Sequence, residues 1–307
     1  DFFTPGWSDY RKRAYVCTYE VGGRLQEGNN CLAVVLADGW AGAPFGPKGH
    51  AVAFAPRTMF VAELVVNYVD GSAETISTNK KWKWRRGAIR KNSIYNGETY
   101  DARKAIEAWA SEESSERGWV AVDVVEAPQI KLTDKKCPPV RITEKRAPIS
   151  LRRSKKKWIA DFGQNLVGVM RIQLRNTKPG QKIVLKFAEM LQANGSLYTE
   201  NLRDATATDI YYCKGGDAES YMPRFTFHGF RYAQIEGFAH LEAQDLTACV
   251  MHNDLKKTGS FDCSDPLLNQ LQSCIVWGQR GNFLEAPTDC PQRDERLGWS
   301  GDVQVFV

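Results

Sequence analysis

Short apolar segments separated by turn signals run through most of the chain, and they constrain its fold more than any other feature. Residues 170–174 alternate apolar and polar side chains, as half-buried strands should. Residues 32–36 and 60–68 are further predicted strands, and the pairs Asp70-Gly71 and Asn194-Gly195 predict tight turns. Many short strands joined by Gly and Pro turns favour β-sandwiches over a helical bundle.

The hydrophobic period changes near Gly259. Asp265 and Pro266 offer a helix cap followed by a proline in the first turn. The apolar residues that then recur at close to helical spacing are Leu267, Leu268, Leu271 and Ile275. The chain is therefore predicted to be mainly β and to end in a helical segment. The predicted domains are a β-sandwich over residues 1–148, a second β-sandwich over residues 149–254, and the beginning of a helical domain over residues 255–307.

Two stretches of the second predicted domain carry specific expectations. Residues 159–169 predict a strand, a turn at Gly163 and another apolar run. Residues 224–232 alternate aromatic and polar side chains, and a strand that exposed its phenylalanines would suit stacking on a sugar. Burial of these aromatics in a sandwich core is the favoured interpretation, with His228 and Arg231 joining loops through hydrogen bonds.

The charge pattern argues against nucleic acid and membrane as partners. The net charge is +5, but the basic residues are scattered in short runs, of which the densest is RRSKKK at residues 152–157. A nucleic-acid footprint would gather such charge on one face with interleaved aromatics, so this run is predicted to be a solvated linker or hairpin. No window of eighteen apolar residues is present, so no transmembrane helix is predicted, and no signal peptide is visible at the start.

Cysteine usage favours a reducing compartment. The eight cysteines include no C-x-x-C pair, and no histidine pair stands at metal-ligand spacing, so neither a metal site nor a metal cofactor is predicted. Some cysteines lie in apolar stretches, as Cys249 does, where a free thiol behaves as a small buried hydrophobe. A cytoplasmic location is therefore favoured over a secreted or periplasmic one.

Residues 288–302, with the sequence TDCPQRDERLGWSGD, are the candidate functional stretch. They contain four carboxylates, two arginines, a tryptophan and two glycines, without apolar periodicity. Acids and arginines beside an aromatic surface suit a polar ligand such as a sugar. Glycosidic cleavage needs one carboxylic acid that protonates the leaving oxygen and a second carboxylate that activates water or attacks the anomeric carbon. The alternative is a solvated loop stabilised by salt bridges.

The run from residue 282 to residue 302 closely resembles the signature of bacterial-type α-L-rhamnosidases, glycoside hydrolase family 78. Three upstream stretches resemble the same family in the same order: PGWSDY at residues 5–10, DFGQNLVG at residues 161–168 and FHGFRY at residues 227–232. The resemblance implies jelly-roll-like β domains followed by the first helix and loop of an (α/α)6 catalytic barrel. It also implies hydrolysis of terminal α-L-rhamnosides with inversion of configuration, so that the expected partners are rhamnose-containing glycosides or polysaccharides.

The resemblance also implies roles for five residues of this stretch. Glu295 matches the general acid, Asp289 and Asp302 match positions that bind sugar hydroxyls, Trp299 matches one that packs on the apolar face of the sugar, and Arg293 matches a position near the site. A general acid must stay protonated near neutral pH, which nearby carboxylates favour and nearby arginines oppose. The catalytic base of the family lies far downstream and has no counterpart here, so the 307-residue chain alone is expected to be inactive.

Several alternatives stay open from the sequence. The chain could form a non-catalytic carbohydrate-binding pair of β-sandwiches, and it could assemble into a homo-oligomer. Oxygen-rich residues 95–103 could bind calcium, although turn-capping side chains explain the same composition. The family that this chain resembles usually has a tyrosine after the motif that Asp38, Gly39 and Trp40 match. Here Ala41 follows, which weakens the case for a sugar contact by this loop.

Overall fold

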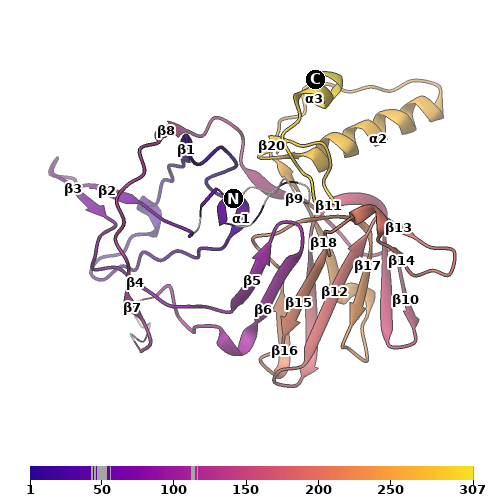
Figure 1. Ribbon diagram of the computed structural model, residues 1–307, viewed down its shortest axis with the longest axis horizontal. Helices are drawn as coiled ribbons and strands as arrows, with labels where there is room; N and C mark the ends of the chain where they lie inside the picture. The colour runs from indigo at the N-terminus through magenta and orange to yellow at the C-terminus, as the bar shows by residue number, and fades with distance from the viewer. Residues whose placement is uncertain are drawn as a thin grey trace.

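The computed structural model describes residues 1–42, 44, 46, 54–55, 57–111, 115 and 117–306, with the side chains of the last two left out. Its main element is a ten-stranded sheet, curled on itself (Figure 1). The strands of this sheet are β5 (Ile89–Ser93), β6 (Gly97–Asp101), β9 (Val140–Arg146), β10 (Ser150–Ser154), β11 (Lys157–Thr177), β12 (Lys182–Ala188), β15 (Thr208–Tyr212), β16 (Gly216–Tyr221), β17 (His228–Glu236) and β18 (Leu246–Asn253). The chain is mainly β, as predicted.

Strand β11 is the most extensively paired strand of the sheet, because it pairs with four other strands along its length. Its first part pairs with β10 and β17, and its second part pairs with β18 and then β16. The pairing with β17 shifts register between Asp161 and Leu166, which is the behaviour of a β-bulge. The turn predicted at Gly163 is therefore wrong: Gly163 has a φ of 73°, but it lies in the irregular middle of one long strand, and the strand resumes beyond it.

The predicted alternation in residues 170–174 is confirmed. Met170, Ile172 and Leu174 are buried, while the two polar residues between them are half-exposed. These side chains join a single large core with the aromatics of β11, β12 and β17. Each fully buried apolar side chain of this kind stabilises the fold by about 1.5–3 kcal/mol relative to an exposed one. The apolar residues therefore determine which face of each strand packs against the core.

The main sheet crosses the boundary predicted at residue 148. Strands β5, β6 and β9 all precede that residue, and β6 pairs in parallel with β15, while β9 pairs with β18. Alternation of apolar and polar residues shows which residues form a strand, but it does not show which distant strand pairs with it. The prediction therefore assigned β5, β6 and β9 to the first domain, although the sheet that they complete lies mostly in the second.

The remaining strands form two-stranded sheets. They are β1 (Arg13–Val16) with β8 (Lys131–Asp134), β2 (Glu63–Asn67) with β3 (Ala73–Ser77), β4 (Lys83–Trp84) with β7 (Val120–Ala121), β13 (Met190–Leu191) with β14 (Leu197–Tyr198), and β19 (Phe283–Leu284) with β20 (Ala286–Pro287). The turns at Asp70-Gly71 and Asn194-Gly195 join β2 to β3 and β13 to β14, as predicted. The strand predicted over residues 32–36 is wrong: this segment is irregular and largely exposed, and no strand of the described residues pairs with it.

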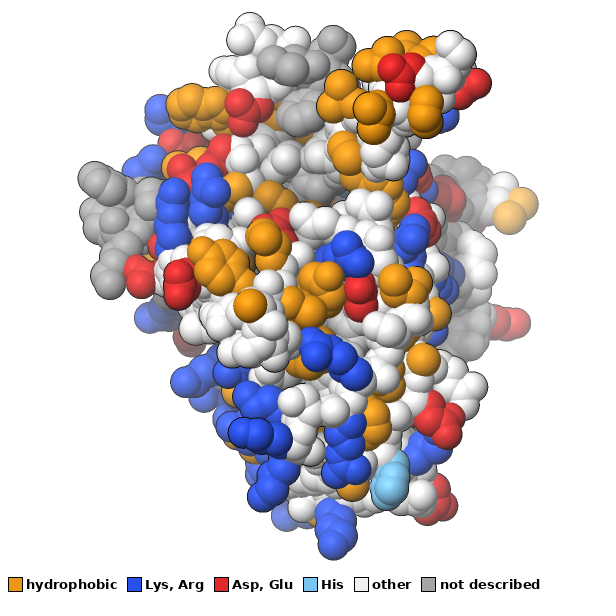
Figure 2. Space-filling model, turned by 90° about the vertical axis from the view of Figure 1, so that its right-hand side faces the viewer, with side chains coloured by type: hydrophobic (Ala, Val, Ile, Leu, Met, Phe, Trp, Pro, Cys, Tyr) orange, Lys and Arg blue, Asp and Glu red, His pale blue; other side chains and the backbone are white. Residues whose placement is uncertain are grey.

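The basic run at residues 152–157 forms the hairpin between β10 and β11, one of the two predicted forms. Figure 2 views the molecule from the side on which β10 lies in Figure 1, and it shows lysine and arginine side chains gathered over the lower part of that face. Two basic side chains of the hairpin already have partners: Arg152 donates to the carbonyl of Gly195, and Lys157 lies 3.4 Å from a carboxylate oxygen of Glu236.

Helix α2 (Pro266–Asn282) begins where the sequence predicted. The side chain of Asp265 caps it by accepting from the backbone N–H of Leu267 at 2.8 Å, which satisfies one of the free donors of the first turn. The four predicted apolar residues lie on an exposed face of α2, and Leu267 is 77% exposed. Within the described residues, no helix has the length and apolar character needed to cross a membrane.

The short helices are α1 (Gly39–Gly42), α3 (Ser300–Phe306) and the 3-10 turns η1 (Gly22–Arg24), η2 (Ala102–Lys104), η3 (Glu200–Leu202) and η4 (Ala243–Asp245). Trp40 of α1 is buried against Phe3 and Phe227. Phe227 itself is buried, which confirms the core interpretation of that aromatic. His228 bonds to Asp209 of β15 at 3.1 Å and Arg231 bonds to Asp161 of β11 at 2.8 Å. Both side chains therefore make the predicted hydrogen bonds, but they join strands of the main sheet and not loops.

Candidate functional site

The acidic loop, defined here as residues 288–298, is closed at its base by its own backbone. Thr288 and Gly298 form an isolated antiparallel bridge. The N–H of Asp289 donates to the carbonyl of Leu297 at 3.1 Å, and the N–H of Leu297 donates back to Oδ1 of Asp289 at 2.9 Å. One carboxylate oxygen of Asp289 is therefore committed to holding the loop closed.

Arg296 fills the inside of this loop and is fully buried. Its Nη1 donates to the carbonyls of Ile94 at 2.7 Å and Phe227 at 2.9 Å, and its guanidinium lies 4.6 Å from the centre of the Phe227 ring. Desolvation lowers the pKa of Arg296 to about 10, so it still carries its charge at neutral pH. Arg296 thus anchors the loop to the β domain and points away from Glu295.

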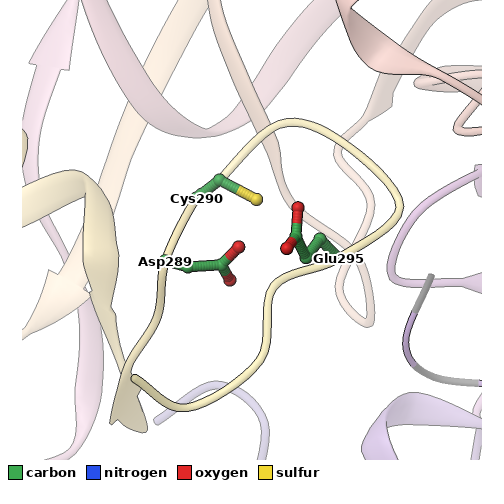
Figure 3. A group of neighbouring side chains, drawn as sticks. All are labelled: Asp289, Cys290 and Glu295. Atoms are coloured by element: carbon green, nitrogen blue, oxygen red, sulfur yellow. The ribbon is translucent and has the colours of Figure 1, made fainter. Parts of the chain in front are cut away.

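Asp289, Cys290 and Glu295 point toward one another inside the loop (Figure 3). Their carboxylate and thiol atoms lie within 4.8 Å of one another. Oε2 of Glu295 accepts from Nε of Arg293 at 2.8 Å and from Nη1 of Arg203 at 2.8 Å. The loop therefore presents two carboxyl groups and two guanidinium groups in one cluster.

The two carboxyl groups are perturbed in opposite directions. The hydrogen bond from Arg293 lowers the pKa of Glu295, whereas burial, reinforced by the negative charge of Glu295, raises the pKa of Asp289. A carboxylate oxygen of each residue lies within 4.8 Å of one of the other, and Oδ2 of Asp289 has no hydrogen-bond partner among the described residues. The raised pKa of Asp289 favours a proton on the Asp289 side of the pair. In this arrangement Glu295 is the ionised member of the pair.

Cys290 does not supply a nucleophile. Burial raises the pKa of its thiol to about 11, so the reactive thiolate is scarce at neutral pH. The same protonated thiol makes the cluster a poor set of metal ligands, since a metal needs the thiolate. The two guanidinium groups already on Glu295 also disfavour a cation there.

The five predicted site residues separate into two groups. Asp289, Arg293 and Glu295 are brought together, with Nη2 of Arg293 3.8 Å from Oδ2 of Asp289. Trp299 is 57% exposed just before α3, and Asp302 is exposed in the first turn of that helix. Within the described part of the chain, neither side chain is hydrogen-bonded to the trio. Both face solvent beside the loop.

The four motifs of the sequence meet around this loop. A Cβ added to Gly298 would lie 2.7 Å from the ring of Trp7, and one added to Gly229 would lie 2.9 Å from Cβ of Gln292. A Cβ added to Gly281 would lie 2.9 Å from the side chain of Val167. Each of these close approaches needs a glycine, so the segments around residues 5–10, 161–168 and 227–232 support the loop rather than forming separate sites.

Sequence reasoning missed three residues that hold the loop. Arg203 reaches Glu295 from the turn after η3, and the hydroxyl of Tyr95 donates to the backbone carbonyl of Glu295 at 2.6 Å. Glu189 accepts from Nε2 of Gln292 at 3.0 Å. Their partners are about 90 to 200 residues away in sequence, and no local pattern marks such a contact.

The calcium hypothesis for residues 95–103 is less favoured than the capping alternative. Asp101 accepts from Nε of Arg103 at 2.8 Å and caps η2, and Glu98 accepts from the hydroxyl of Tyr221 at 3.2 Å. The side chain of Asn96 accepts from the N–H of Thr206 at 3.0 Å. In the described residues each of these side chains bonds to the protein, as capping groups do, while Oε2 of Glu98 has no hydrogen-bond partner there.

The β scaffold and the loop that it holds define the class: a chain in which a β-rich part precedes and supports a helix followed by an acidic loop. Three successive domain descriptions match it. They are the α-L-rhamnosidase N-terminal domain over residues 1–144, the bacterial α-L-rhamnosidase concanavalin-like domain over residues 151–252, and the bacterial α-L-rhamnosidase six-hairpin glycosidase domain over residues 256–307. The chain belongs to the bacterial α-L-rhamnosidase family.

Curated relatives and solved structures agree. The chain is 41% identical to an α-L-rhamnosidase of Streptomyces avermitilis over 100% of its own length and 30% of the relative, and 38% identical to one of Formosa agariphila over 100% and 34%. The crystal structure of the Streptomyces avermitilis enzyme complexed with L-rhamnose superimposes with a TM-score of 0.90 at 38% identity, over 100% of this chain and 30% of that one. The α-L-rhamnosidase from Dictyoglumus thermophilum gives 0.86 at 34% identity, over 99% and 34%. The chain thus spans about a third of the length of these relatives.

Proposed function

We propose that the protein to which these residues belong hydrolyses terminal α-L-rhamnosides with inversion of configuration. Three successive domain matches and the curated relatives support rhamnoside hydrolysis. The structural observation that supports it most directly is the pair of neighbouring carboxyl groups, Asp289 and Glu295, inside the acidic loop. Glu295 is the proposed general acid. Asp289, Arg293 and Asp302 are proposed to hold sugar hydroxyls, and exposed Trp299 is proposed to pack on the apolar face of the sugar.

The proposed acid must gain a proton before it can act. Arg293 and Arg203 keep Glu295 ionised in the present arrangement, while its partner Asp289 has a raised pKa. We expect substrate hydroxyls to draw Arg293 away from Glu295, which removes the largest cause of its lowered pKa. Because the two carboxyl groups lie close enough to influence each other's ionisation, the proton of the pair can then reside on Glu295.

The base of an inverting reaction must be a carboxylate other than Asp289. Inverting glycosidases separate the acid and the base by roughly 6.5–9.5 Å to admit water, whereas oxygen atoms of Asp289 and Glu295 lie within 4.8 Å. We propose that the base lies in the part of the relatives that residues 1–307 do not span. These residues by themselves are then proposed to bind rhamnosides weakly and not to turn them over.

The assignment of Glu295 is tested by Glu295→Gln in the full-length protein. The substitution keeps the shape and removes the acid, so hydrolysis of unactivated rhamnosides should fall by roughly 10²–10⁴-fold. A rhamnoside with a good leaving group should lose less, because its leaving oxygen needs less protonation. Steady-state kinetics on both substrates measure this.

Asp217→Asn, an exposed change on β16, is the control and should leave both rates unchanged. Equal rates for Glu295→Gln and the wild type on both substrates would show that Glu295 is not the acid. If the wild-type full-length protein binds rhamnose and cleaves neither substrate, the non-catalytic carbohydrate-binding alternative replaces the proposal.

A further inference from the structure

The carboxylate of Glu189 accepts hydrogen bonds from three amide side chains that belong to three separate segments. Nδ2 of Asn165 donates to Oε1 at 2.9 Å, Nδ2 of Asn201 donates to Oε2 at 3.2 Å, and Nε2 of Gln292 donates to Oε2 at 3.0 Å. Asn165 lies in the irregular middle of β11, Asn201 in η3 and Gln292 in the acidic loop. Glu189 lies between β12 and β13, so it joins the main sheet, η3 and the loop at one point.

For two of these amides, Glu189 is the only side-chain partner in the described part of the chain. The amide oxygens of Asn201 and Gln292 are buried there without a hydrogen-bond partner, and the bond of each amide nitrogen goes to Glu189. A carboxylate accepts and does not donate, and hydrogen bonds to a charged group are stronger than neutral ones. Glu189 therefore determines where these two side chains lie.

The position of Asn201 bears on Arg203, because both belong to the same tight turn. Arg203 follows η3 with φ 56° and ψ −119°, a conformation that residues other than glycine rarely adopt and that persists only where its surroundings hold it. The bond from Asn201 to Glu189 is one such restraint, and the burial of Leu202 is another. From this turn Nη1 of Arg203 reaches Oε2 of Glu295 at 2.8 Å.

Gln292 links the same carboxylate to the second guanidinium group on Glu295. It directly precedes Arg293, whose Nε also donates to Oε2 of Glu295 at 2.8 Å. The hydrogen bonds that Glu189 accepts in the described residues all come from the three amides. Glu189 thus acts on Glu295 through the two arginines and not by direct contact.

We propose that Glu189 is a positioning residue for rhamnoside hydrolysis, which holds Arg203 and Arg293 at Oε2 of the proposed acid Glu295. The inference rests on the proposed function. The negative charge of Glu189 by itself raises the pKa of a neighbouring carboxyl, whereas the arginines that it positions lower the pKa of Glu295. Removing Glu189 therefore tells its charge from its positioning effect. The other titratable groups that face Glu295 are Asp289, Cys290 and Tyr95.

Glu189→Gln in the full-length protein tests the proposal, because an amide offers one accepting oxygen where the carboxylate has two. The alkaline limb of the pH–rate profile on an unactivated rhamnoside should move to higher pH, since Arg203 and Arg293 no longer hold Glu295 ionised. In an Arg203→Ala background the same substitution should move the limb less, because part of its effect passes through Arg203. Hydrogen exchange of residues 197–206 should become about tenfold faster or more, as the loss of a hydrogen bond to a carboxylate predicts.

Glu236→Gln is the matched control. Glu236 accepts from the amide of Gln234 at 2.7 Å, at the end of β17 opposite to Gly229, which meets the acidic loop. This variant should leave both the alkaline limb and the exchange of residues 197–206 unchanged.

Three results would overturn the proposal. They are an alkaline limb of Glu189→Gln that stays in place or moves to lower pH, unchanged exchange of residues 197–206, and a limb shift that is as large in the Arg203→Ala background as in the wild type. If Glu189→Gln fails to fold, Asn201→Ala decides, since it removes one donor and leaves Glu189 in place; a limb that does not move to higher pH in this variant also overturns the proposal. Unchanged hydrolysis by Glu295→Gln would instead remove the proposed acid, so the two failures are read from different variants.

Discussion

At the scale of single residues, Arg203 is the most informative contact that the β domains make with the acidic loop. Its Nη1 donates to Oε2 of Glu295 at 2.8 Å, and its positive charge adds to the effect of Arg293 in lowering the pKa of that carboxyl. A residue from the β scaffold thus acts directly on the proposed acid. In the proposed reaction the β domains would therefore influence the ionisation of the acid as well as support the loop.

Replacing Arg203 with Ala in the full-length protein should therefore raise the pKa of Glu295. The alkaline limb of the pH–rate profile reports the group that must be protonated, so that limb should move to higher pH. Arg175→Ala is the matched control, because Arg175 pairs with Asp245 at 2.9 Å away from the loop. An alkaline limb that stays in place in Arg203→Ala would show that the contact does not act on the acid.

The raised pKa of the buried carboxyl of Glu98 predicts how the free energy of unfolding depends on pH. Glu98 is 2% exposed, and desolvation, with the charge of Asp209, raises its pKa to about 7 from 4.5. The hydroxyl of Tyr221 donates to Oε1 of Glu98 at 3.2 Å, and Asp209, which pairs with His228, and Arg224 also act on this carboxyl. Between pH 4.5 and about 7 the folded state keeps a proton on Glu98 that the unfolded state has lost. The contribution of Glu98 to the free energy of unfolding is therefore fully present below about pH 4.5, and it is lost as the pH rises through about 7.

The substitution Glu98→Gln should remove this dependence. Relative to the wild type, the variant should gain stability as the pH rises from 5 to 8, by on the order of 3 kcal/mol. Denaturant unfolding of both proteins across this pH range measures the difference. Glu63→Gln, an exposed change on β2, is the control, and its free energy of unfolding should change with pH as that of the wild type does. A constant difference between Glu98→Gln and the wild type at every pH would contradict the raised pKa.

At the scale of elements, the acidic loop is shaped by glycines that let distant segments approach it. Gly298 meets the ring of Trp7, and Gly229 meets Gln292, so side chains at these positions would force the loop off the β domain. The loop is thus positioned by tertiary contacts more than by its own sequence. Its internal hydrogen bonds close it, and the surrounding segments orient it.

Gly298→Ala should push the acidic loop away from Trp7. The added Cβ would lie 2.7 Å from the indole ring, and overpacking of this kind costs about 1–3 kcal/mol. The free energy of unfolding should fall by that amount, and hydrogen exchange in residues 288–298 should become faster. Gly259→Ala is the control, since a Cβ there meets no atom within 4 Å. Unchanged exchange in the loop would mean that Trp7 yields without disturbing it.

At the scale of the whole molecule, α2 leaves an apolar face without cover. Leu267, Leu268, Leu271 and Ile275 are all exposed within the described structure, which is the pattern of a helix that packs against further elements. In contrast, the β sheet has a continuous core of its own. The two regions should therefore differ in stability when residues 1–307 are isolated.

The isolated 307-residue protein should self-associate through α2, or be cut by protease after about residue 255 while the β domains resist. It should also show no turnover of an aryl α-L-rhamnoside. Light scattering, limited proteolysis and a rhamnosidase assay measure the three properties. Leu267→Gln combined with Leu271→Gln should reduce self-association, because it removes the exposed apolar side chains. Multiple turnovers by the isolated protein would contradict the proposal that the base lies beyond these residues.

Interactions between residues close in sequence determined several elements of this protein, and these elements could be predicted from the sequence alone. Period-two alternation placed residues 170–174 in a strand, Asp70-Gly71 formed the predicted turn, and Asp265 with Pro266 began the helix, because each depends on neighbours within a few residues. The density of acids and arginines likewise marked residues 288–302 as the candidate site.

Only the tertiary structure decided which distant groups these elements meet. Sheet pairing joined β6 to β15 across the predicted domain boundary, and burial turned Arg296 inward to backbone carbonyls while Arg203 reached Glu295 from the β domain. The ionisation of Glu295 follows from these contacts, and the amide groups that meet at Glu189 likewise come from distant segments. Desolvation and hydrogen bonding depend on the three-dimensional surroundings of a group, and residue order alone does not specify them.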